Sequence, residues 1–461
     1  MRPRGTELWP QSDHATVPDV NETVELLQQL IRNECVNDGD PDSGHEHRSV
    51  TTIADYLGAE GEIFEPHPGR QSVIYRISGS KPEAPSLALV PHLDVVPVNR
   101  QGWSVEPFAA EISDGFVWGR GAVDMLNVTA AMVTAFRPYL RGEKQLPGDL
   151  ILAAVADEEN SGLLGAKLLV EERWDLVGAD YLLTEVAYPA LESPEGNVYP
   201  ISVGEKGPYW TTMRSSGTPG HGSSPYGTEN ALETLVSALH GLFTTPMPAA
   251  ITDEWREFVN GLDLDKDLAD ALVDPDRVDR AIDRIAVDDP TFARYVHAAT
   301  HLTVSPNKAW AGVKANVIPD LATAEVDLRA LPGMDRTFVD QHLRKAMGVG
   351  SDHIELEPMS DHLPNTSPRG NVLWDAIVDG IEIHTGSRRV VPALMTVATD
   401  ARYFRERGTI AYGVGLFDDR IDFGKFLSLF HGHDERVSVE SVIRTTALLG
   451  SVLDRFADLT A

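Results

Sequence analysis

The segment at residues 150–156, LILAAVA, places the tightest constraint on the fold of this chain. All of its residues are apolar, and a continuous apolar run of this length is typical of a strand buried on both faces. A sheet built from such strands needs helices on both sides. Further strand-like segments alternate with helical patterns, at residues 73–77, 87–90 and 181–183 against 21–32, 122–140 and 166–172. The sequence therefore predicts an α/β fold with a central sheet flanked by helices.

The pattern changes near Gly204. Strand-like residues and a loop rich in Gly, Ser and Pro come first, helical stretches follow at 231–242 and 255–296, and residues 322–328 alternate as a half-exposed strand does. This order is typical of an inserted, smaller α+β domain. The expected boundaries are 1–204 and 360–461 for the main domain and 205–359 for the insertion.

Composition excludes several classes of protein. The 461 residues contain 39 Lys and Arg against 70 Asp and Glu, a net charge of −31, which disfavours nucleic acid and anionic membranes as partners. One cysteine, Cys35, allows neither an internal disulfide nor a cysteine-rich zinc site. No apolar run reaches the roughly 18 residues of a membrane span, and the first 20 residues lack the apolar core of a signal peptide. We therefore expect a cytoplasmic protein.

Polar clusters follow several of the predicted strands. A single strand-end carboxylate is most simply a helix cap or a surface charge. Five clusters at one sheet edge would repel one another unless cations neutralised them. The clusters are His92 with Asp94, Asp124, Asp157 with Glu158 and Glu159, Glu185, and the group His431, His433, Asp434 and Glu435 in FHGHDER.

The residue types in these clusters favour a particular metal chemistry. Imidazoles and carboxylates without thiolates suit zinc, with cobalt or manganese as substitutes. Two ions that share a carboxylate can polarise a carbonyl and activate water, and a carboxylate that binds no metal can take the proton. The sequence contains no G-x-S-x-G, G-x-x-x-x-G-K-[ST], G-x-G-x-x-G or H-E-x-x-H motif. The sequence therefore contains no motif typical of a serine hydrolase, a nucleotide-binding enzyme or an H-E-x-x-H metalloprotease.

From about residue 20 to the C-terminus, the chain resembles the M20 family of metallopeptidases and amidohydrolases. The resemblance implies a zinc-peptidase-type catalytic domain with a mixed central sheet, and an inserted lid and dimerisation domain. It rests on the blocks PHLDVVP, GRGAVDMLN, ADEENSG, TEV, GEKG, GTPGHGSSP, NVIPD, VDLRALPG, ATDARYF and FHGHDERVS.

The resemblance implies two zinc ions per subunit. His92 and Glu185 would bind one ion, Glu159 and His431 the other, and Asp124 would bridge both. Two histidines compete at the C-terminal motif. The family spacing H-x-x-x-E selects His431, and His433 stays open as the alternative.

The resemblance also implies catalytic roles for three residues. Glu158 would be the general base and later the acid, and Asp94 would orient His92. The same-face alternation of residues 92 and 94 lets the Asp94 carboxylate reach the imidazole. His221 would polarise the scissile carbonyl, in family dimers often from the partner subunit, which implies a homodimer. The simpler interpretation of His221 is a loop histidine in a Gly- and Ser-rich turn.

Substrate contacts are implied for Asn316, Arg329 and Gly413. Arg329 would bind a free carboxylate, for which a guanidinium fork is well suited. Its alternative is a pair with Asp327 on the same strand face, and the alternative for Asn316 is a turn before Pro319.

The chain departs from the family pattern at two positions, Leu126 and Ala398. Leu126 stands where many members have lysine, a position that is not a ligand. Ala398 replaces the glycine before TDAR, which predicts a narrower substrate cleft.

These observations predict a dinuclear zinc hydrolase that cleaves a peptide or N-acyl amide bond next to a free carboxylate. The C-terminal motif is most similar to the carboxypeptidase S and aminoacylase-1 side of the family, so small peptides or N-acyl amino acids are the expected substrates. One alternative is a deacylase such as acetylornithine deacetylase or succinyl-diaminopimelate desuccinylase. Others are a catalytically idle scaffold that binds metal or a metabolite, and a phosphoesterase, for which the blocks supply little basic charge beyond Arg329.

Overall fold

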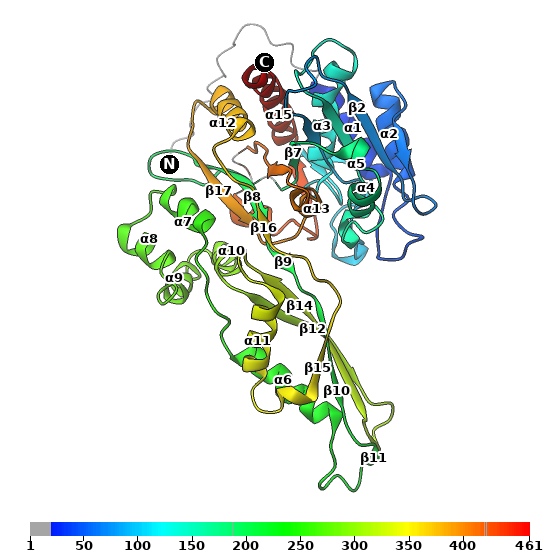
Figure 1. Ribbon diagram of the computed structural model, residues 1–461, viewed down its shortest axis with the longest axis vertical. Helices are drawn as coiled ribbons and strands as arrows, with labels where there is room; N and C mark the ends of the chain where they lie inside the picture. The colour runs from blue at the N-terminus through cyan, green and yellow to red at the C-terminus, as the bar shows by residue number, and fades with distance from the viewer. Residues whose placement is uncertain (1–19, 187, 419, 421) are drawn as a thin grey trace.

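The computed structural model describes residues 20–186, 188–418, 420 and 422–461. Residues 1–19, on which the expectation of no signal peptide rests, lie outside this range. The largest element is a nine-stranded mixed sheet in the order β1-β2-β6-β3-β7-β18-β8-β16, with β17 also paired to β8 (Figure 1). Its strands are β1 (Glu62–Phe64), β2 (Ser72–Ile77), β3 (Leu87–Leu89), β6 (Leu150–Ala154), β7 (Tyr181–Thr184), β8 (Tyr199–Glu205), β16 (Asn365–Thr366), β17 (Val390–Met395) and β18 (Ile410–Gly413).

Both faces of this sheet are buried under helices. In β6, Leu150 and Leu152 point into one core, whereas Ile151 and Ala153 point into a second core on the opposite face. The first core contains side chains of α1 (Val20–Arg32), α2 (His47–Leu57), α3 (Leu126–Leu140), α12 (Val372–Thr385) and α15 (Val439–Thr460). The second contains side chains of α4 (Ala166–Glu172), α5 (Trp174–Val177) and α13 (Ala401–Glu406). The predicted α/β fold with a helix-flanked mixed sheet is confirmed.

Helix α3 begins at Leu126, four residues later than the sequence pattern predicts. The preceding Gly119 and Gly121 have φ of 159° and 86°, and residues 119–125 form turns instead of a helix. Glycine permits such angles at no steric cost. This turn carries Asp124 out of the helix.

A smaller α+β unit, here called the small unit, extends away from the large sheet (Figure 1). Helices α6 (Ala231–Thr244) and α11 (Arg336–Met347) share a core with its sheet. The strands are β12 (Thr303–Ala311), β14 (Leu321–Ala330), β10 (Thr211–Ser216) and β15 (Ile354–Pro358) in that order, with β9 (Gly207–Pro208) paired to β14. The alternating burial along β14 agrees with the half-exposed strand expected there.

Four helices lie between α6 and β12 in sequence but pack elsewhere. They are α7 (Asp253–Asn260), α8 (Lys266–Leu272), α9 (Val278–Ile285) and α10 (Pro290–Thr300). The sequence places them in the inserted domain, whereas Trp255, Phe258 and Tyr295 are buried in the core of the large sheet. An amphipathic pattern predicts a helix but not which core receives its apolar face. The domain boundaries 1–204, 205–359 and 360–461 stay predictions.

Three short elements complete the frame of the site. A three-stranded sheet, β19-β5-β4, joins β19 (Arg436–Ser438) to β5 (Phe116–Trp118) and β4 (Ile112–Ser113), so the C-terminal motif lies against the segment before Asp124. Helix α14 (Phe423–Leu427) precedes that motif, and a single helical turn, Glu158–Asn160, follows β6. Within the described residues, no helix combines the length and apolar character needed to cross a membrane.

Candidate metal centre

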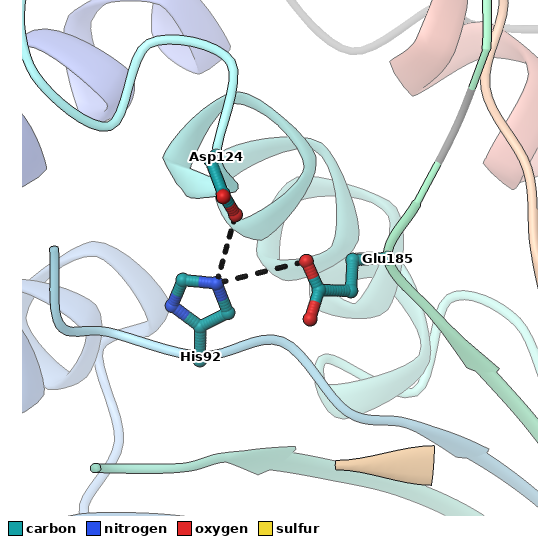
Figure 2. Close-up of side chains that lie close together, drawn as sticks. All are labelled: His92, Asp124 and Glu185. Atoms are coloured by element: carbon teal, nitrogen blue, oxygen red, sulfur yellow. Dashed lines mark hydrogen bonds and ion pairs between the residues drawn. The ribbon is translucent and has the colours of Figure 1, made fainter. Parts of the chain in front are cut away.

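Two strand ends and one turn bring the first group of polar side chains together. His92 follows β3, Glu185 follows β7 directly, and Asp124 occupies the turn before α3. Figure 2 shows Nε2 of His92 between the two carboxylates, 3.2 Å from Oδ1 of Asp124 and 3.8 Å from Oε2 of Glu185. One potential ligand atom from each residue lies within 4.8 Å of the others. All three side chains are buried, so the group can enclose one metal ion.

A second group uses the other oxygen of Asp124. Its Oδ2 lies 3.3 Å from Nε2 of His431, which is also 3.1 Å from Oε2 of Glu159. Asp124, Glu159 and His431 meet the same 4.8 Å criterion, so Asp124 belongs to both groups. His433 belongs to neither group among the described residues. The structure therefore brings all five residues expected as ligands into one cluster.

The backbone carbonyl of Asp94 orients His92 more closely than its carboxylate does. Nδ1 of His92 donates to the Asp94 carbonyl oxygen at 3.0 Å, whereas Oδ1 of Asp94 lies 3.6 Å away. With Nδ1 protonated, Nε2 keeps its lone pair on the side of Asp124, as a metal ligand requires. The Asp94 carboxylate instead accepts the backbone N–H groups of Glu158 at 3.2 Å and Glu159 at 3.1 Å.

A buried polar network behind Asp94 was not predicted from the sequence. Asn37 donates to Oδ2 of Asp94 at 2.8 Å and to Oδ1 of Asp157 at 3.1 Å. Arg70, with no exposed surface, pairs with Asp157 at 2.9 Å and with Glu46 at 2.8 Å. These contacts join segments 24 to 120 residues apart, and no local periodicity signals such pairs.

Glu435 positions the shared carboxylate from the other side. Its Oε1 accepts the backbone N–H groups of Val123 at 2.7 Å and Asp124 at 3.1 Å, and its Oε2 pairs with Arg120 at 2.6 Å. Glu435 is fully buried. The glutamate of H-x-x-x-E thus fixes the turn that presents Asp124.

The electrostatics of the cluster fit bound cations. Burial raises the pKa of Glu159 to about 7, and raises the pKa values of Glu158 and Glu185 well above their usual range. Burial opposes protonation of His431, but hydrogen bonds to Asp124 and Glu159 raise its pKa to about 10. Oε1 of Glu159 is buried without a hydrogen-bond partner. Divalent cations would satisfy this oxygen and relieve the repulsion between carboxylates.

Glu158 is set apart from the ligand groups. Its half-buried carboxylate makes no hydrogen bond or ion pair with the described residues, although neighbouring His92, Glu159 and Asp124 all influence its pKa. A carboxylate in this position can take up a proton without first losing a partner. That property suits a general base.

Two predicted residues lie far from this cluster within the chain. His221 is exposed on β11 (Gly220–His221), at the end of the small unit farthest from the large sheet (Figure 1). Strand β11 pairs with β13 (Val317–Ile318), and Gly222 donates to the carbonyl of the exposed Asn316 at 2.8 Å. His221 and Asn316 are therefore close together but apart from the five candidate ligands.

The other two predicted substrate contacts have packing partners. Arg329 pairs with Asp327 at 3.1 Å and its guanidinium lies 5.9 Å from the Trp210 ring centre, so the alternative pairing is present. Gly413 ends β18, and a Cβ there would lie 2.2 Å from the carbonyl oxygen of Glu185. The glycine thus permits close approach of β18 to the end of β7.

The fold and the shared-carboxylate cluster define a class, the metal-dependent hydrolases of the zinc-peptidase type. Residues 88–455 match the model of peptidase family M20/M25/M40, and the chain belongs to this family. The family, and an enzyme acting on C–N amide or peptide bonds, are thereby confirmed as predicted.

Individual relatives agree with this assignment. Human aminoacylase-1 is 25% identical over 462 residues, covering 99% of this chain and 98% of that protein. The succinyl-diaminopimelate desuccinylase of Rhodospirillum centenum is 25% identical over 437 residues, covering 94% and 97%. The M20 family metallo-carboxypeptidase Sso-CP2 from Sulfolobus solfataricus superimposes with a TM-score of 0.72 at 18% identity, covering 95% of this chain and 99% of that one.

Proposed function

We propose that this chain is a dinuclear zinc hydrolase that cleaves a peptide or N-acyl amide bond next to a free carboxylate. The observation that carries the proposal is that the two carboxylate oxygens of Asp124 face different histidines. Oδ1 is directed to His92, and Oδ2 is directed to His431. A carboxylate shared in this way is suited to bridging two ions. Two histidines and three carboxylates without a thiolate favour zinc, with cobalt or manganese as substitutes.

Zinc bound in this cluster supplies Lewis-acid polarisation of the scissile carbonyl and makes water more acidic. Glu158 takes the proton of the attacking water and then delivers it to the leaving nitrogen. The Asp94 carboxylate accepts a hydrogen bond from the backbone N–H of Glu158 and so anchors the backbone from which the Glu158 side chain extends. Arg329 and Asn316 stay candidates for binding the free carboxylate.

We further propose a homodimer in which His221 serves the site of the partner subunit, where it polarises the scissile carbonyl. Within one chain, β11, the strand that includes His221, lies at the end of the small unit farthest from the large sheet (Figure 1). Helix α6 exposes an apolar face, formed by Leu232, Val236 and Phe243, which are 42, 54 and 68% exposed. Strand β12 is an edge strand beside it. An apolar helix face and an unpaired sheet edge both favour association with a second copy.

The similarity to an aminoacylase, a desuccinylase and a metallo-carboxypeptidase supports small peptides or N-acyl amino acids as substrates. A deacylase is consistent with the same site, and we expect the enzyme to act in the cytoplasm. Activity of the zinc-loaded or cobalt-loaded protein on dipeptides and on N-acetyl, N-succinyl and long-chain N-acyl amino acids tests the proposal. Hydrolysis of at least one class, abolished by Glu158→Ala, is expected. Two bound zinc ions with no turnover on any substrate would instead favour the idle scaffold.

A further inference from the structure

The turn that carries Glu158 has a backbone conformation that needs support. Asp157 and Ser161, which flank the helical turn Glu158–Asn160, have φ of 69° and 74°, in the left-handed region. Residues other than glycine adopt this region at a cost, and they keep it where surrounding contacts hold them. The Glu158 carboxylate has no hydrogen bond or ion pair with the described residues. Its position therefore depends on how firmly the backbone of the turn is held.

Two side chains of α13 hold the carbonyl at the end of this turn. Nη2 of Arg402 donates to the Ser161 carbonyl oxygen at 2.7 Å, and the Tyr403 hydroxyl donates to the same oxygen at 2.6 Å. Both side chains are buried, and the Arg402 guanidinium lies 4.5 Å from the Tyr403 ring centre. Each donor therefore keeps the other in place. Because Asp94 accepts the N–H groups at the beginning of the turn, both of its ends are fixed.

The chain approaches α13 closely at Gly162, the residue after Ser161. A Cβ at Gly162 would lie 2.2 Å from Oδ1 of Asp400 and 3.4 Å from the Tyr403 ring. Its φ of 63° is also one that glycine adopts without steric cost. The loop after Glu158 and the beginning of α13 therefore fit directly against each other.

The beginning of α13 is in turn anchored to the central sheet. Glu205 ends β8, and its Oε2 accepts the backbone N–H of Thr399 at 2.7 Å and the Thr399 hydroxyl at 2.6 Å. Nη1 of Arg402 donates to the Thr399 carbonyl at 2.7 Å. A series of hydrogen bonds thus runs from β8 through α13 to the turn. It connects the sequence blocks GEKG, ATDARYF and ADEENSG.

We infer that Arg402 and Tyr403 are positioning residues for the general base, because they hold the Ser161 carbonyl and so fix the backbone from which Glu158 extends. The inference rests on the proposed function, in which Glu158 moves the proton. A carboxylate without a partner is displaced when its backbone moves. Displacement of a reacting group by about 1 Å can lower the rate roughly 100-fold.

Glu159, on the same turn, has a further support that Glu158 lacks. Its Oε2 lies 3.1 Å from Nε2 of His431, and a bound ion would hold it as well. Loosening the turn should therefore displace Glu158 more than Glu159. The expected result is a slower chemical step at metal sites that stay filled.

Tyr403→Phe tests the inference, since it keeps the buried ring and removes one donor. For the substrate of the proposed panel that the wild type hydrolyses fastest, kcat should fall about 5- to 20-fold, with KM within about twofold. Two zinc ions per chain should be retained. Arg402→Lys should give the same pattern, because one ammonium group cannot reproduce the two directed contacts of the guanidinium with the carbonyls of Ser161 and Thr399.

The matched control is Tyr75→Phe. Tyr75 and Tyr403 are both 4% exposed, and the Tyr75 hydroxyl donates to the backbone carbonyl of Ala59, after α2, at 2.9 Å. Both tyrosine variants should lose similar thermal stability, but Tyr75→Phe should keep the kcat of the wild type. An unchanged kcat in Tyr403→Phe, or an equal fall in Tyr75→Phe, would overturn the inference. A fall in kcat together with a loss of zinc would also overturn it, because the side chains would then act on the ligand Glu159.

Hydrogen exchange separates this inference from the proposed function. The amides of residues 157–164 should exchange about tenfold faster in Tyr403→Phe than in the wild type, and at the wild-type rate in Tyr75→Phe. A wild type that hydrolyses nothing but shows this difference would contradict the proposed function and support the hold of α13 on the turn. A wild type that hydrolyses the panel, with neither kcat nor exchange altered in Tyr403→Phe, would contradict the inference alone.

Discussion

The carboxylate of Asp94 and the backbone of Glu158 are joined by a hydrogen bond, in which Oδ1 accepts the Glu158 N–H at 3.2 Å. The same carboxylate holds the next residue, Glu159, and the Asp94 carbonyl fixes His92. One aspartate therefore sets the position of the proposed general base together with two proposed ligands. Sequence spacing suggested only the link to His92.

Replacing Asp94 should therefore slow turnover and also weaken metal binding. Asp94→Ala removes the acceptor of both backbone N–H groups, and we expect activity to fall about 10- to 100-fold, as for other residues that support metal ligands. Asp94→Asn should lose less, because it keeps one acceptor oxygen. Steady-state kinetics and zinc content of the purified variants measure the effect. Asp180→Ala, which removes a surface carboxylate, is the control, and equal kinetics in all three variants would contradict the prediction.

The zinc content of single-ligand variants should separate the two ligand groups. Wild-type protein should carry two zinc ions per chain, and His92→Ala should carry one, because it opens only the first group. Asp124→Ala should retain less than His92→Ala, since Asp124 belongs to both groups. Elemental analysis after gel filtration gives the ratios.

His433→Ala is the matched control for the C-terminal motif. It should keep both ions, whereas His431→Ala should lose one. The opposite result would make His433 the ligand and would contradict the geometry around Asp124.

The grouping of polar residues at one sheet edge was partly predictable from local patterns. His92, Glu158, Glu159 and Glu185 come just after apolar strands, and the carboxyl ends of neighbouring parallel strands meet at one edge of a sheet. Sequence reasoning alone put polar residues at one edge. The separate role of each residue came from the family resemblance and stays a prediction.

Contacts between distant segments were not predictable. Arg70 and Asp157 are 87 residues apart in the sequence. Neither the hydrophobic periodicity nor the local composition indicates that they form a pair. The packing of the helices at 253–300 was likewise not predictable from the sequence. Their apolar faces predict helices correctly, but the choice between two cores depends on tertiary packing.

Arg70 should be one of the most sensitive positions for stability. Its guanidinium, Glu46 and Asp157 are all completely buried, so Arg70→Ala leaves two carboxylates without their cation. Removal of one partner from such a site costs about 3–5 kcal/mol in the free energy of unfolding. Urea denaturation measures the loss. Arg76→Ala is the control, because Arg76 pairs with Asp149 in a partly exposed position, where about 1 kcal/mol or less is expected. Similar losses for both variants would contradict the prediction.

Gly413 should tolerate no side chain, for a reason of packing. The Cβ of Gly413→Ala would lie 2.2 Å from the carbonyl oxygen of Glu185, so strand β18 or the residue that follows β7 must shift. We expect a loss of about 1–3 kcal/mol in stability, as for other overpacked sites, and a lower zinc content. Gly450→Ala in α15 has open space around its Cβ and should be neutral or more stable by up to about 1 kcal/mol. A stable Gly413→Ala protein with two zinc ions would show that β18 can move without disturbing Glu185.

Mixing two inactive variants should restore activity if His221 acts across a dimer. Glu158→Ala disables the site of its own chain, and His221→Ala disables the site to which its small unit is presented. In a heterodimer of the two, one site combines an intact Glu158 with an intact His221 from the other chain. After unfolding and refolding together at equal amounts, about one quarter of all sites should be active, because half of the dimers are heterodimers with one intact site each. The separately refolded variants, mixed afterwards, give the baseline. If His221 acts within its own chain, no combination contains an intact site and the mixture stays at that baseline, which would contradict the proposed role in the partner subunit.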